Sequence, residues 1–242
     1  MKPENVIEVE NLSKQFGNFK AVDSISFELK KGEIFGFLGA NGAGKTTAMK
    51  ILIGISHPSS GKARVAGFDV YKETENIKKN IGYMSQKFAL YDDLTVRENI
   101  MFFGGIYGLS RKIIKEKTKA LEEELQLQDI SNQLVGSLPL GWKQKLSFSV
   151  ALLHQPKIVF LDEPTGGVDP ITRRQFWEMI YKAADQGTTI FVTTHYMDEA
   201  EYCDRVSIMV NGRIEALDSP KKLKQQFQAE SMNEVFLKLA RG

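Results

Sequence analysis

The stretch Gly39-Ala40-Asn41-Gly42-Ala43-Gly44-Lys45-Thr46 lies between the apolar run Ile34–Leu38 and Thr47–Leu52, a run typical of a helix. It fits the pattern G-x-x-x-x-G-K-[ST] of a phosphate-binding loop between a buried strand and a helix. Glycines let backbone N–H groups curl towards a phosphate, and the helix N-terminus directs unpaired donors and its positive dipole end to the same place. The residues predicted to hold phosphate are Gly39, Asn41, Gly42, Ala43, Gly44, Lys45, Thr46 and Thr47.

Two side chains of this loop have predicted roles of their own. Lys45 is expected to reach the β- and γ-phosphates as a point charge, and Thr46 to place its hydroxyl on Mg²⁺. A glycine-rich surface turn is the alternative interpretation. Gly-Lys-Thr at this spacing, with a strand before it and a helix after it, favours the phosphate site.

Length and composition limit the class of protein. The 242 residues, 42% of them hydrophobic, suffice for a core in one domain. The 32 basic and 30 acidic side chains give a net charge of only +2, so no nucleic-acid partner is expected. Cys203 is the single cysteine, which excludes an internal disulfide and fits a reducing compartment. Without a signal-peptide core or a run near the ~18 apolar residues of a membrane span, we expect a soluble, cytoplasmic polypeptide.

The hydrophobic pattern predicts two kinds of sheet. Val6–Glu10 and Ser24–Leu29 alternate apolar and polar residues, as antiparallel strands do. Lys157–Leu161 and the β-branched run Thr188–Thr194 flank a predicted helix, which indicates a parallel α/β sheet. Further along, two runs flank Asn211-Gly212 in a hairpin pattern, and Pro220 opens a helical tail.

More than 100 residues separate Thr46 from Lys157, too many for an ordinary βα connection, so we expect an inserted folded unit. The insert has helical patterns. Ser110 caps a segment that runs to Leu125, and a second amphipathic helix ends at His154-Gln155-Pro156. A capping box at Thr95 opens another helix, whose apolar face is either core or a docking surface. That face carries Met101, Phe102, Phe103 and Tyr107.

Polar side chains follow the predicted parallel strands, at the edge of the sheet where open α/β sheets bind ligands. Asp162 is the candidate Mg²⁺ partner, and Glu163 is placed to polarise a water for attack on a γ-phosphate. Helix capping is the alternative role for this acidic pair. His195 is a candidate γ-phosphate contact, with a purely structural histidine as the alternative. His57 and His154 are expected to be surface or capping residues.

The order of these motifs resembles the ATP-binding subunits of ABC transporters, from about Val6 to Leu217. The resemblance implies an α/β P-loop NTPase fold with a mostly parallel core sheet, an antiparallel N-terminal β subdomain and an inserted α-helical subdomain. It implies one ATPase domain over 1–242, with the helical subdomain at about 90–155 and a helical tail at about 218–242. The matching motifs are Walker A at Gly39–Thr46, the Q-loop at Gln86, Walker B ending at Asp162-Glu163, the D-loop at Gly166–Asp169 and the switch histidine His195.

The resemblance also implies roles for single residues. Phe16 matches the aromatic that stacks on adenine, the alternative being a core residue of the N-terminal sheet. Gln86 matches the residue that senses Mg²⁺ and the attacking water. The resemblance therefore implies that Thr46, Gln86 and Asp162 hold the metal. It also implies that Glu163, His195 and Gln86 are the catalytic residues. The segment Phe88–Tyr91 matches a groove where a cytoplasmic helix of the membrane subunit docks.

The chain departs from the family at the signature motif, where Leu138-Pro139-Leu140-Gly141-Trp142 replaces Leu-Ser-Gly-Gly-Gln. In the family this motif closes over the γ-phosphate held by the other subunit. Pro139 has neither a hydroxyl nor an N–H group, and Leu140 adds bulk, while Gly141 and a helix N-terminus remain. The variant resembles a subgroup of multidrug-type exporters. The residues predicted to form the dimer lid are Leu138, Pro139, Leu140, Gly141, Trp142 and the D-loop Asp169.

The sequence therefore predicts an ATPase subunit that binds ATP and Mg²⁺, pairs with a second ATPase subunit in a homodimer or heterodimer, and powers transport, with export favoured. Its expected partners are integral membrane transporter subunits, at the inner face of the cell membrane. One alternative is a soluble ABC-type ATPase of DNA repair or translation, but the chain lacks the long coiled-coil insert or second ATPase domain typical of those proteins. Another is a regulatory subunit with weak hydrolysis, against which Glu163 and His195 count.

Overall fold

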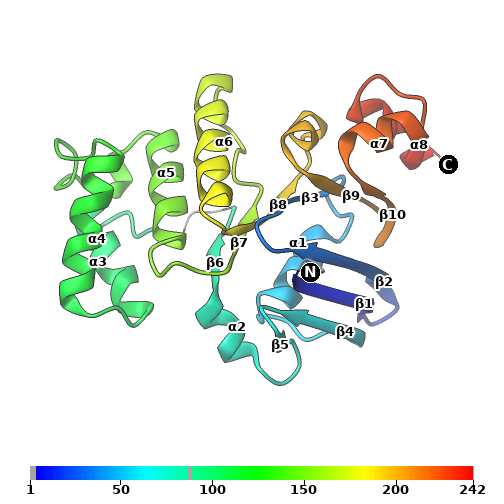
Figure 1. Ribbon diagram of the computed structural model, residues 1–242, viewed down its shortest axis with the longest axis horizontal. Coiled ribbons are helices and arrows are strands. Elements are labelled where there is room, and N and C mark those ends of the chain that lie inside the picture. The colour runs from blue at the N-terminus through cyan, green and yellow to red at the C-terminus, as the bar shows by residue number, and fades with distance from the viewer. Residues whose placement is uncertain (1–3, 87–88, 242) are drawn as a thin grey trace.

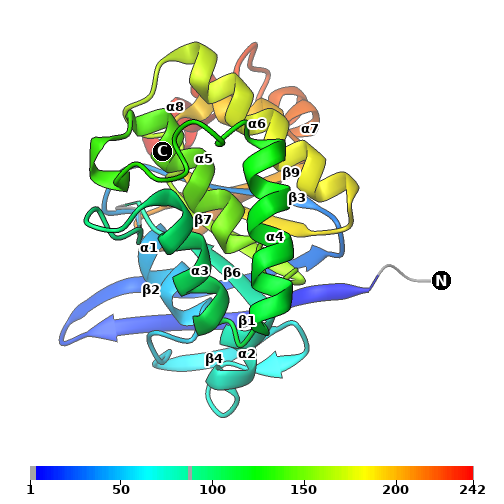
Figure 2. The ribbon, with the colours of Figure 1, turned by 90° about the vertical axis from the view of Figure 1, so that its left-hand side faces the viewer.

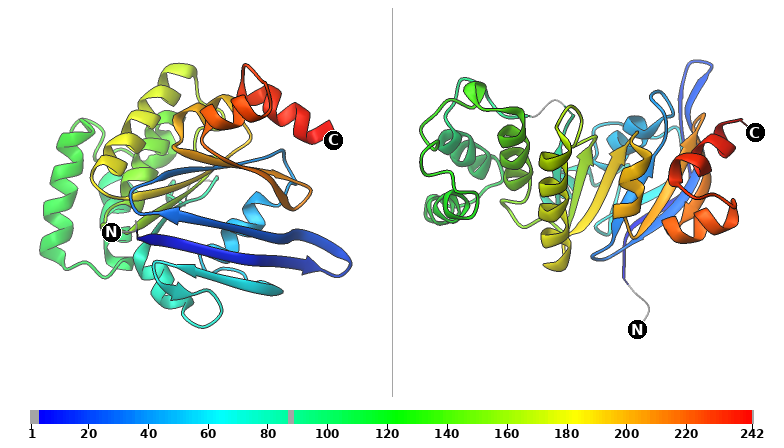
Figure 3. Two further views of the ribbon diagram at one scale, coloured as in Figure 1. Left: turned by 45° about the vertical axis from the view of Figure 1, so that its right-hand side comes forward. Right: turned by 90° about the horizontal axis from the view of Figure 1, so that it is seen from above.

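An antiparallel sheet forms one side of the molecule in the computed structural model, which describes residues 4–86 and 89–241. Its strand order is β2-β1-β4-β5. The long hairpin of the first two strands runs the length of this sheet (Figure 3). The predicted antiparallel N-terminal sheet is confirmed, and its strands are β1 (Asn5–Phe16), β2 (Phe19–Lys30), β4 (Ser60–Val65) and β5 (Phe68–Asp69).

A second, six-stranded sheet has the order β10-β9-β3-β8-β7-β6. All neighbours in it are parallel except the β9–β10 hairpin, which confirms the mostly parallel core sheet. Parallel strands end at one edge, so the residues that follow β3, β6, β7 and β8 lie along the same edge of the sheet. The strands are β3 (Ile34–Leu38), β6 (Ile81–Met84), β7 (Ile158–Asp162), β8 (Thr189–Thr194), β9 (Arg205–Val210) and β10 (Arg213–Asp218).

Two groups of helices lie towards opposite ends of the molecule. Figures 1 and 2 show α3, α4 and α5 together at one end of the molecule, and Figure 1 shows α7 and α8 towards the other. No helix within the described ranges is long and apolar enough to cross a membrane. The helices are α1 (Lys45–Leu52), α2 (Thr74–Asn80), α3 (Val96–Ile106), α4 (Arg111–Glu124), α5 (Leu140–Ala151), α6 (Pro170–Asp185), α7 (Pro220–Gln226) and α8 (Met232–Arg241), with short 3₁₀ turns η1 (Val135–Ser137) and η2 (Met197–Tyr202).

Local sequence rules account for how these helices start. The Thr95 hydroxyl accepts from the Glu98 N–H, and the Glu98 carboxylate accepts from the Thr95 N–H, which is the predicted capping box. The Ser110 hydroxyl accepts from the Ile113 N–H at the start of α4, also as predicted.

Alternation along β3 divides the core between the two faces of the parallel sheet. Phe35 and Phe37 face the antiparallel sheet and α1, while Ile34 and Leu38 pack with α5 and α6 on the other face. Phe191 of β8 is central to the first cluster, where its ring centroid lies 5.2–6.3 Å from those of Phe27, Phe35, Phe37 and Phe160. This aromatic layer joins the two sheets.

The sequence did not predict the elements between α1 and the Q-loop. β4, β5, α2 and β6 occupy this segment before the helical insert begins. The strand β6 is only four residues long and contains Gly82, where a side-chain carbon would lie 2.3 Å from the Ala151 carbonyl oxygen. Its pairing with β7 is a contact between distant parts of the chain, which a local pattern does not reveal.

His154 also differs from its expected role as a surface or capping residue. Its ring stacks on Tyr107 at 3.9 Å between centroids, and Nε2 lies 3.0 Å from the Ile81 carbonyl oxygen. Burial lowers the pKa of this imidazole. The residue therefore ties the helical insert to the first residue of β6.

We expect Phe191→Ala to lower the free energy of unfolding by about 3–5 kcal/mol, because it opens a cavity among four rings. Denaturant titration of the purified chain measures this change. Phe16→Ala is the matched control: Phe16 is 54% exposed, so its removal should change stability by no more than about 0.5 kcal/mol. Equal losses in the two variants would contradict the central place given to Phe191.

Candidate nucleotide site

The loop at Gly39–Thr46 is held between the two sheets. A side-chain carbon on Gly44 would lie 2.2 Å from the Ala21 carbonyl oxygen of β2, and one on Gly39 would lie 2.4 Å from the Met209 carbonyl oxygen of β9. Gly44 also has a φ of +105°, in the region that favours glycine. Only glycine fits at these two points, so the backbone itself is the floor of the site.

Backbone and side-chain hydrogen-bond donors lie at the start of α1, beside the loop. Within the described residues, no protein acceptor takes the backbone N–H groups of Lys45 and Thr46, the first two residues of the helix. The buried Lys45 ammonium donates to the carbonyl oxygens of Gly39 (2.7 Å) and Ala40 (3.1 Å). Burial lowers the pKa of Lys45, and the nearby Glu163 opposes this effect. The cradle is therefore rich in donors and suits an anion.

Thr193 of β8 fixes both acidic residues at the end of β7. Its hydroxyl donates to Asp162 Oδ1 at 2.7 Å, and its hydroxyl and carbonyl oxygens each lie 3.1 Å from the Glu163 backbone nitrogen. Burial raises the pKa of Asp162, and the Thr193 hydroxyl partly offsets this. Glu163 adopts a φ of +48°, a strained conformation that its two backbone contacts hold in place.

The Glu163 carboxylate is the meeting point of the predicted catalytic residues. Its Oε2 accepts a hydrogen bond from Gln86 Nε2 at 3.0 Å and lies 3.1 Å from His195 Nδ1. Its Oε1 lies 3.6 Å from Lys45 Nζ. The structure thus brings three side chains around one carboxylate: Gln86 after β6, His195 after β8 and Lys45 at the start of α1.

The residues present fit a nucleoside triphosphate with Mg²⁺. A cavity of about 500 Å³ lies over the loop, because the loop glycines have no side chains to fill it. Thr46, Gln86 and Glu163 line this cavity. Thr46, Gln86 and Asp162 offer hydroxyl, amide and carboxylate oxygens, the hard ligands that Mg²⁺ takes together with phosphate oxygens. The cavity is lined by Phe19, Ala21, Asn41, Gly42, Gly44, Lys45, Thr46, Thr47, Gln86 and Glu163.

Phe16 lies at the end of the β1–β2 hairpin, where it pairs with Phe19. It is exposed, so it is not a core residue of the N-terminal sheet, and Lys14 Nζ sits 5.0 Å from its ring centroid. Phe19 lines the cavity, and sequence reasoning missed it. The available signal for Phe19 was its position, because it is an aromatic residue two positions before Ala21, whose carbonyl group lies against the loop.

Five of the six predicted lid residues line a second cavity of about 470 Å³, namely Pro139, Leu140, Gly141, Trp142 and Asp169. The sixth, Leu138, is instead buried in the core of the helical insert. Pro139 precedes α5, and Leu140 approaches to 3.5 Å of the carbon that a side chain would add to Gly167. Asp169 caps α6 by accepting from the Ile171 and Thr172 N–H groups and from the Thr172 hydroxyl, which lowers its pKa. No described residue lines both this cavity and the phosphate cavity.

Helix α5 is also tied to the acidic loop of its own chain. The fully buried Gln144 donates from Nε2 to the carbonyl oxygen of Pro164, directly after Glu163. The sequence did not single out this residue, because a glutamine in a helix carries no signal of such a contact. It links the predicted lid segment to the loop that begins at Glu163.

The predicted docking segment lies partly outside the described residues, since Phe88 is among those not described. Tyr91 of this segment and Phe102 of α3 are exposed, and their rings meet edge to face at 4.8 Å between centroids. Met101 is exposed as well, whereas Phe103 and Tyr107 pack on the core of the helical insert. The apolar face of α3 is therefore partly core and partly open.

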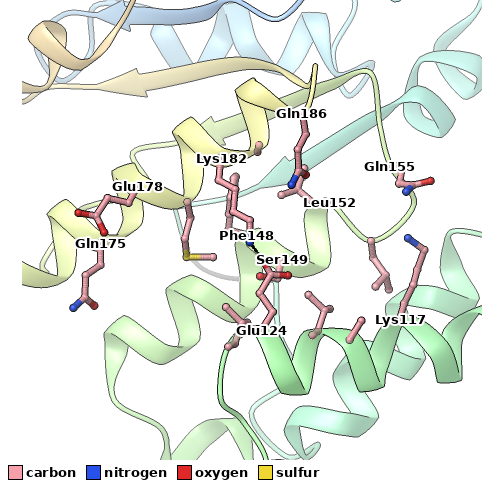
Figure 4. Close-up of a pocket in the computed structure, with 16 residues that line it drawn as sticks. Lys117, Glu124, Phe148, Ser149, Leu152, Gln155, Gln175, Glu178, Lys182 and Gln186 are labelled. Carbon is pink, nitrogen blue, oxygen red and sulfur yellow. Dashed lines mark hydrogen bonds and ion pairs between the residues drawn. The ribbon is translucent and has the colours of Figure 1, made fainter.

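A further cavity, of about 510 Å³, lies between α4, α5 and α6 (Figure 4). Lys182 of α6 pairs with Glu124 of α4 across it. None of the predicted site residues lines this cavity, so we assign it no part in nucleotide binding.

The fold and the glycine loop define the class of this protein as a P-loop nucleotide-binding protein. A family model described as ABC transporter matches residues 22–166. Linearmycin resistance ATP-binding protein LnrL of Bacillus subtilis strain 168 is 36% identical over 241 residues, which cover 96% of this chain and 78% of that protein. The chain therefore belongs to the ABC transporter family, and it is an ATP-binding ATPase unit of that family.

Two further comparisons agree. The probable multidrug ABC transporter ATP-binding protein YbhF of Escherichia coli strain K12 is 45% identical over 241 residues, which cover 98% of this chain but only 42% of that protein. A solved structure of an ATP binding subunit of an ABC transporter matches with a TM-score of 0.86 at 27% identity, covering 97% of this chain and 99% of the other. These relatives favour a transporter subunit over an ATPase of DNA repair or translation.

We expect Gly44→Ala to weaken ATP binding at least about tenfold, because the new methyl group would displace the loop from the Ala21 carbonyl. Gly42→Ala is the matched control, since Gly42 also has a positive φ (+82°) but open space around it. Gly42→Ala should lose clearly less ATP affinity than Gly44→Ala. Titration with a fluorescent ATP analogue measures both affinities, and equal losses would contradict the steric explanation.

Proposed function

We propose that this chain hydrolyses MgATP with Glu163 as the group that polarises the attacking water. The arrangement of Gln86, His195 and Lys45 around the Glu163 carboxylate carries this proposal. His195 and Gln86 orient the water and the γ-phosphate, and Lys45 leaves its carbonyl partners for the β- and γ-phosphates. Mg²⁺, when bound, neutralises developing phosphate charge, and Thr46, Asp162 and Gln86 would hold it.

We further propose that a second ATPase subunit completes the site. In support, the lid residues Pro139–Trp142 and Asp169 line a cavity separate from the phosphate cavity of the same chain. The lid would close on the partner's nucleotide with Gly141 and the α5 N-terminus as its donors, because Pro139 supplies no N–H group. Phe16 stacks on adenine at the hairpin end, where Phe19 already borders the cavity.

The proposed role of the assembly is transport, with export favoured, powered at the inner face of the cell membrane. Residues 1–242 act as one ATPase domain, with a helical subdomain at about 90–155 and a helical tail at about 218–242. The open aromatic pair Tyr91 and Phe102, with Met101, would receive a cytoplasmic helix of the membrane subunit. The names of YbhF and LnrL, which refer to multidrug transport and linearmycin resistance, support export.

Glu163→Gln should leave ATP affinity unchanged within about twofold and reduce turnover at least about 1000-fold, because the amide does not accept a proton from water. Steady-state phosphate release and equilibrium ATP binding measure the two effects. The exposed Glu178→Gln is the control and should have wild-type turnover. Persistent turnover in Glu163→Gln would refute the role given to Glu163.

A tagged chain purified from detergent-solubilised membranes should bring down an integral membrane protein, identified by mass spectrometry. Phe102→Arg should reduce its recovery at least about fivefold, since it places a charge in the aromatic contact. Ile171→Arg is the control on another exposed apolar side chain. Recovery of the chain only from the soluble fraction, on ribosomes or on DNA, would contradict the transport proposal.

A further inference from the structure

Glu199, on the turn η2 after β8, is a fully buried carboxylate that the proposed chemistry does not use. Its Oε1 accepts a hydrogen bond from the Thr165 hydroxyl and lies 3.7 Å from Arg173 Nε. Burial raises the pKa of Glu199, while the Thr165 and Thr194 hydroxyls and the Arg173 charge oppose this effect. A buried carboxylate is costly unless its partners are held in place, so this group constrains its two contacts, Thr165 and Arg173.

Each partner belongs to a segment that carries a proposed site residue. Thr165 lies two residues after Glu163, in the loop that continues to Asp169. Glu199 itself lies four residues after His195, on the turn η2. Thr165 and Glu199 are both buried, so the loop after Glu163 does not shift relative to η2 without disturbing the carboxylate.

Arg173 connects the same carboxylate to the lid and to the histidine. Its backbone N–H donates to the Asp169 carbonyl oxygen at 2.9 Å, at the start of α6. Its guanidinium lies 4.5 Å from the ring centroid of Tyr196, whose ring is in turn 4.2 Å from that of His195. One ion pair thus spans the Asp169 segment and the His195 segment.

We propose that Glu199 is a positioning residue for hydrolysis, which locks the loop from Glu163 to Asp169 against the strand end that bears His195. The 3.1 Å separation of His195 Nδ1 from Glu163 Oε2 depends on the relative placement of these two segments. When a second subunit contacts Asp169, Arg173 and Glu199 transmit the contact to His195. This inference rests on the proposed roles of Glu163 and His195.

The first test is Glu199→Gln in the full chain, because glutamine keeps the volume and an oxygen acceptor for Thr165 but loses the charge opposite Arg173. We expect kcat for ATP to fall about tenfold, with KM and the thermal midpoint nearly unchanged. Glu201→Gln is the matched control on the same turn, since Glu201 is exposed and pairs with Lys224 at 2.6 Å. It should have wild-type kcat.

A double-mutant cycle with His195→Ala distinguishes a positioning role of Glu199 from an effect on protein stability alone. If Glu199 acts through His195, Glu199→Gln should lower the residual single-turnover rate of His195→Ala by less than about twofold. Thr165→Val serves as a second variant, in case Glu199→Gln does not fold, and should lower kcat in the same direction with KM unchanged. Glu199→Asp, which keeps a carboxylate one methylene shorter, should retain more of the wild-type kcat than Glu199→Gln.

Three results would overturn the inference: wild-type kcat in both Glu199→Gln and Thr165→Val, a fall in kcat matched by an equal loss of ATP binding, or full additivity with His195→Ala. The Glu163→Gln variant distinguishes failure of this inference from failure of the proposed function. If Glu163→Gln abolishes turnover while the Glu199 and Thr165 variants do not change it, only the positioning role is lost. If Glu163→Gln retains turnover, the proposed function fails first.

Discussion

The close approach of the glycine loop to two carbonyl groups is the constraint on which the rest of this structure depends. Gly44 lies against Ala21 of the antiparallel sheet, and Gly39 lies against Met209 of the parallel sheet. A side chain at either position would force the sheets apart. Because these contacts fix the loop, α1 starts with its free N–H groups directed into one cavity, and Lys45 is buried beside them. The anion site is thus a product of how the two sheets pack.

The parallel sheet then supplies the remaining chemistry. The adjacent strands β3, β8, β7 and β6 end at one edge, and so deliver the loop, His195, Glu163 and Gln86 to one place. Thr193 shows how closely the edge is specified, since one side chain of β8 contacts both acidic residues after β7. Strain at Glu163 is tolerated because these contacts over-determine its backbone.

Mechanical links extend from this edge in two directions. Gln144 joins the lid helix α5 to Pro164, and Glu199 joins Thr165 to the region of His195 and, through Arg173, to the start of α6. Both side chains are buried and polar, so each fixes its partners more strictly than an apolar contact would. The segment expected to reach a second subunit is therefore rigidly connected to the carboxylate expected to act on water.

The sequence alone determined the phosphate loop, the parallel strands around it and the capped helices at Thr95 and Ser110, because a few consecutive residues encode each of them. It also placed Asp162, Glu163 and His195 at strand ends, and the family resemblance singled out Gln86, which the structure brings to Glu163 together with His195. Tertiary structure alone decided the pairing of β4 with β1 and of β6 with β7, and the stacking of His154 on Tyr107. It also decided the place of Phe19 in the cavity and the ion pair of Glu199 with Arg173. These features join residues far apart in the chain, so their energy comes from burial and pairing that no local pattern contains.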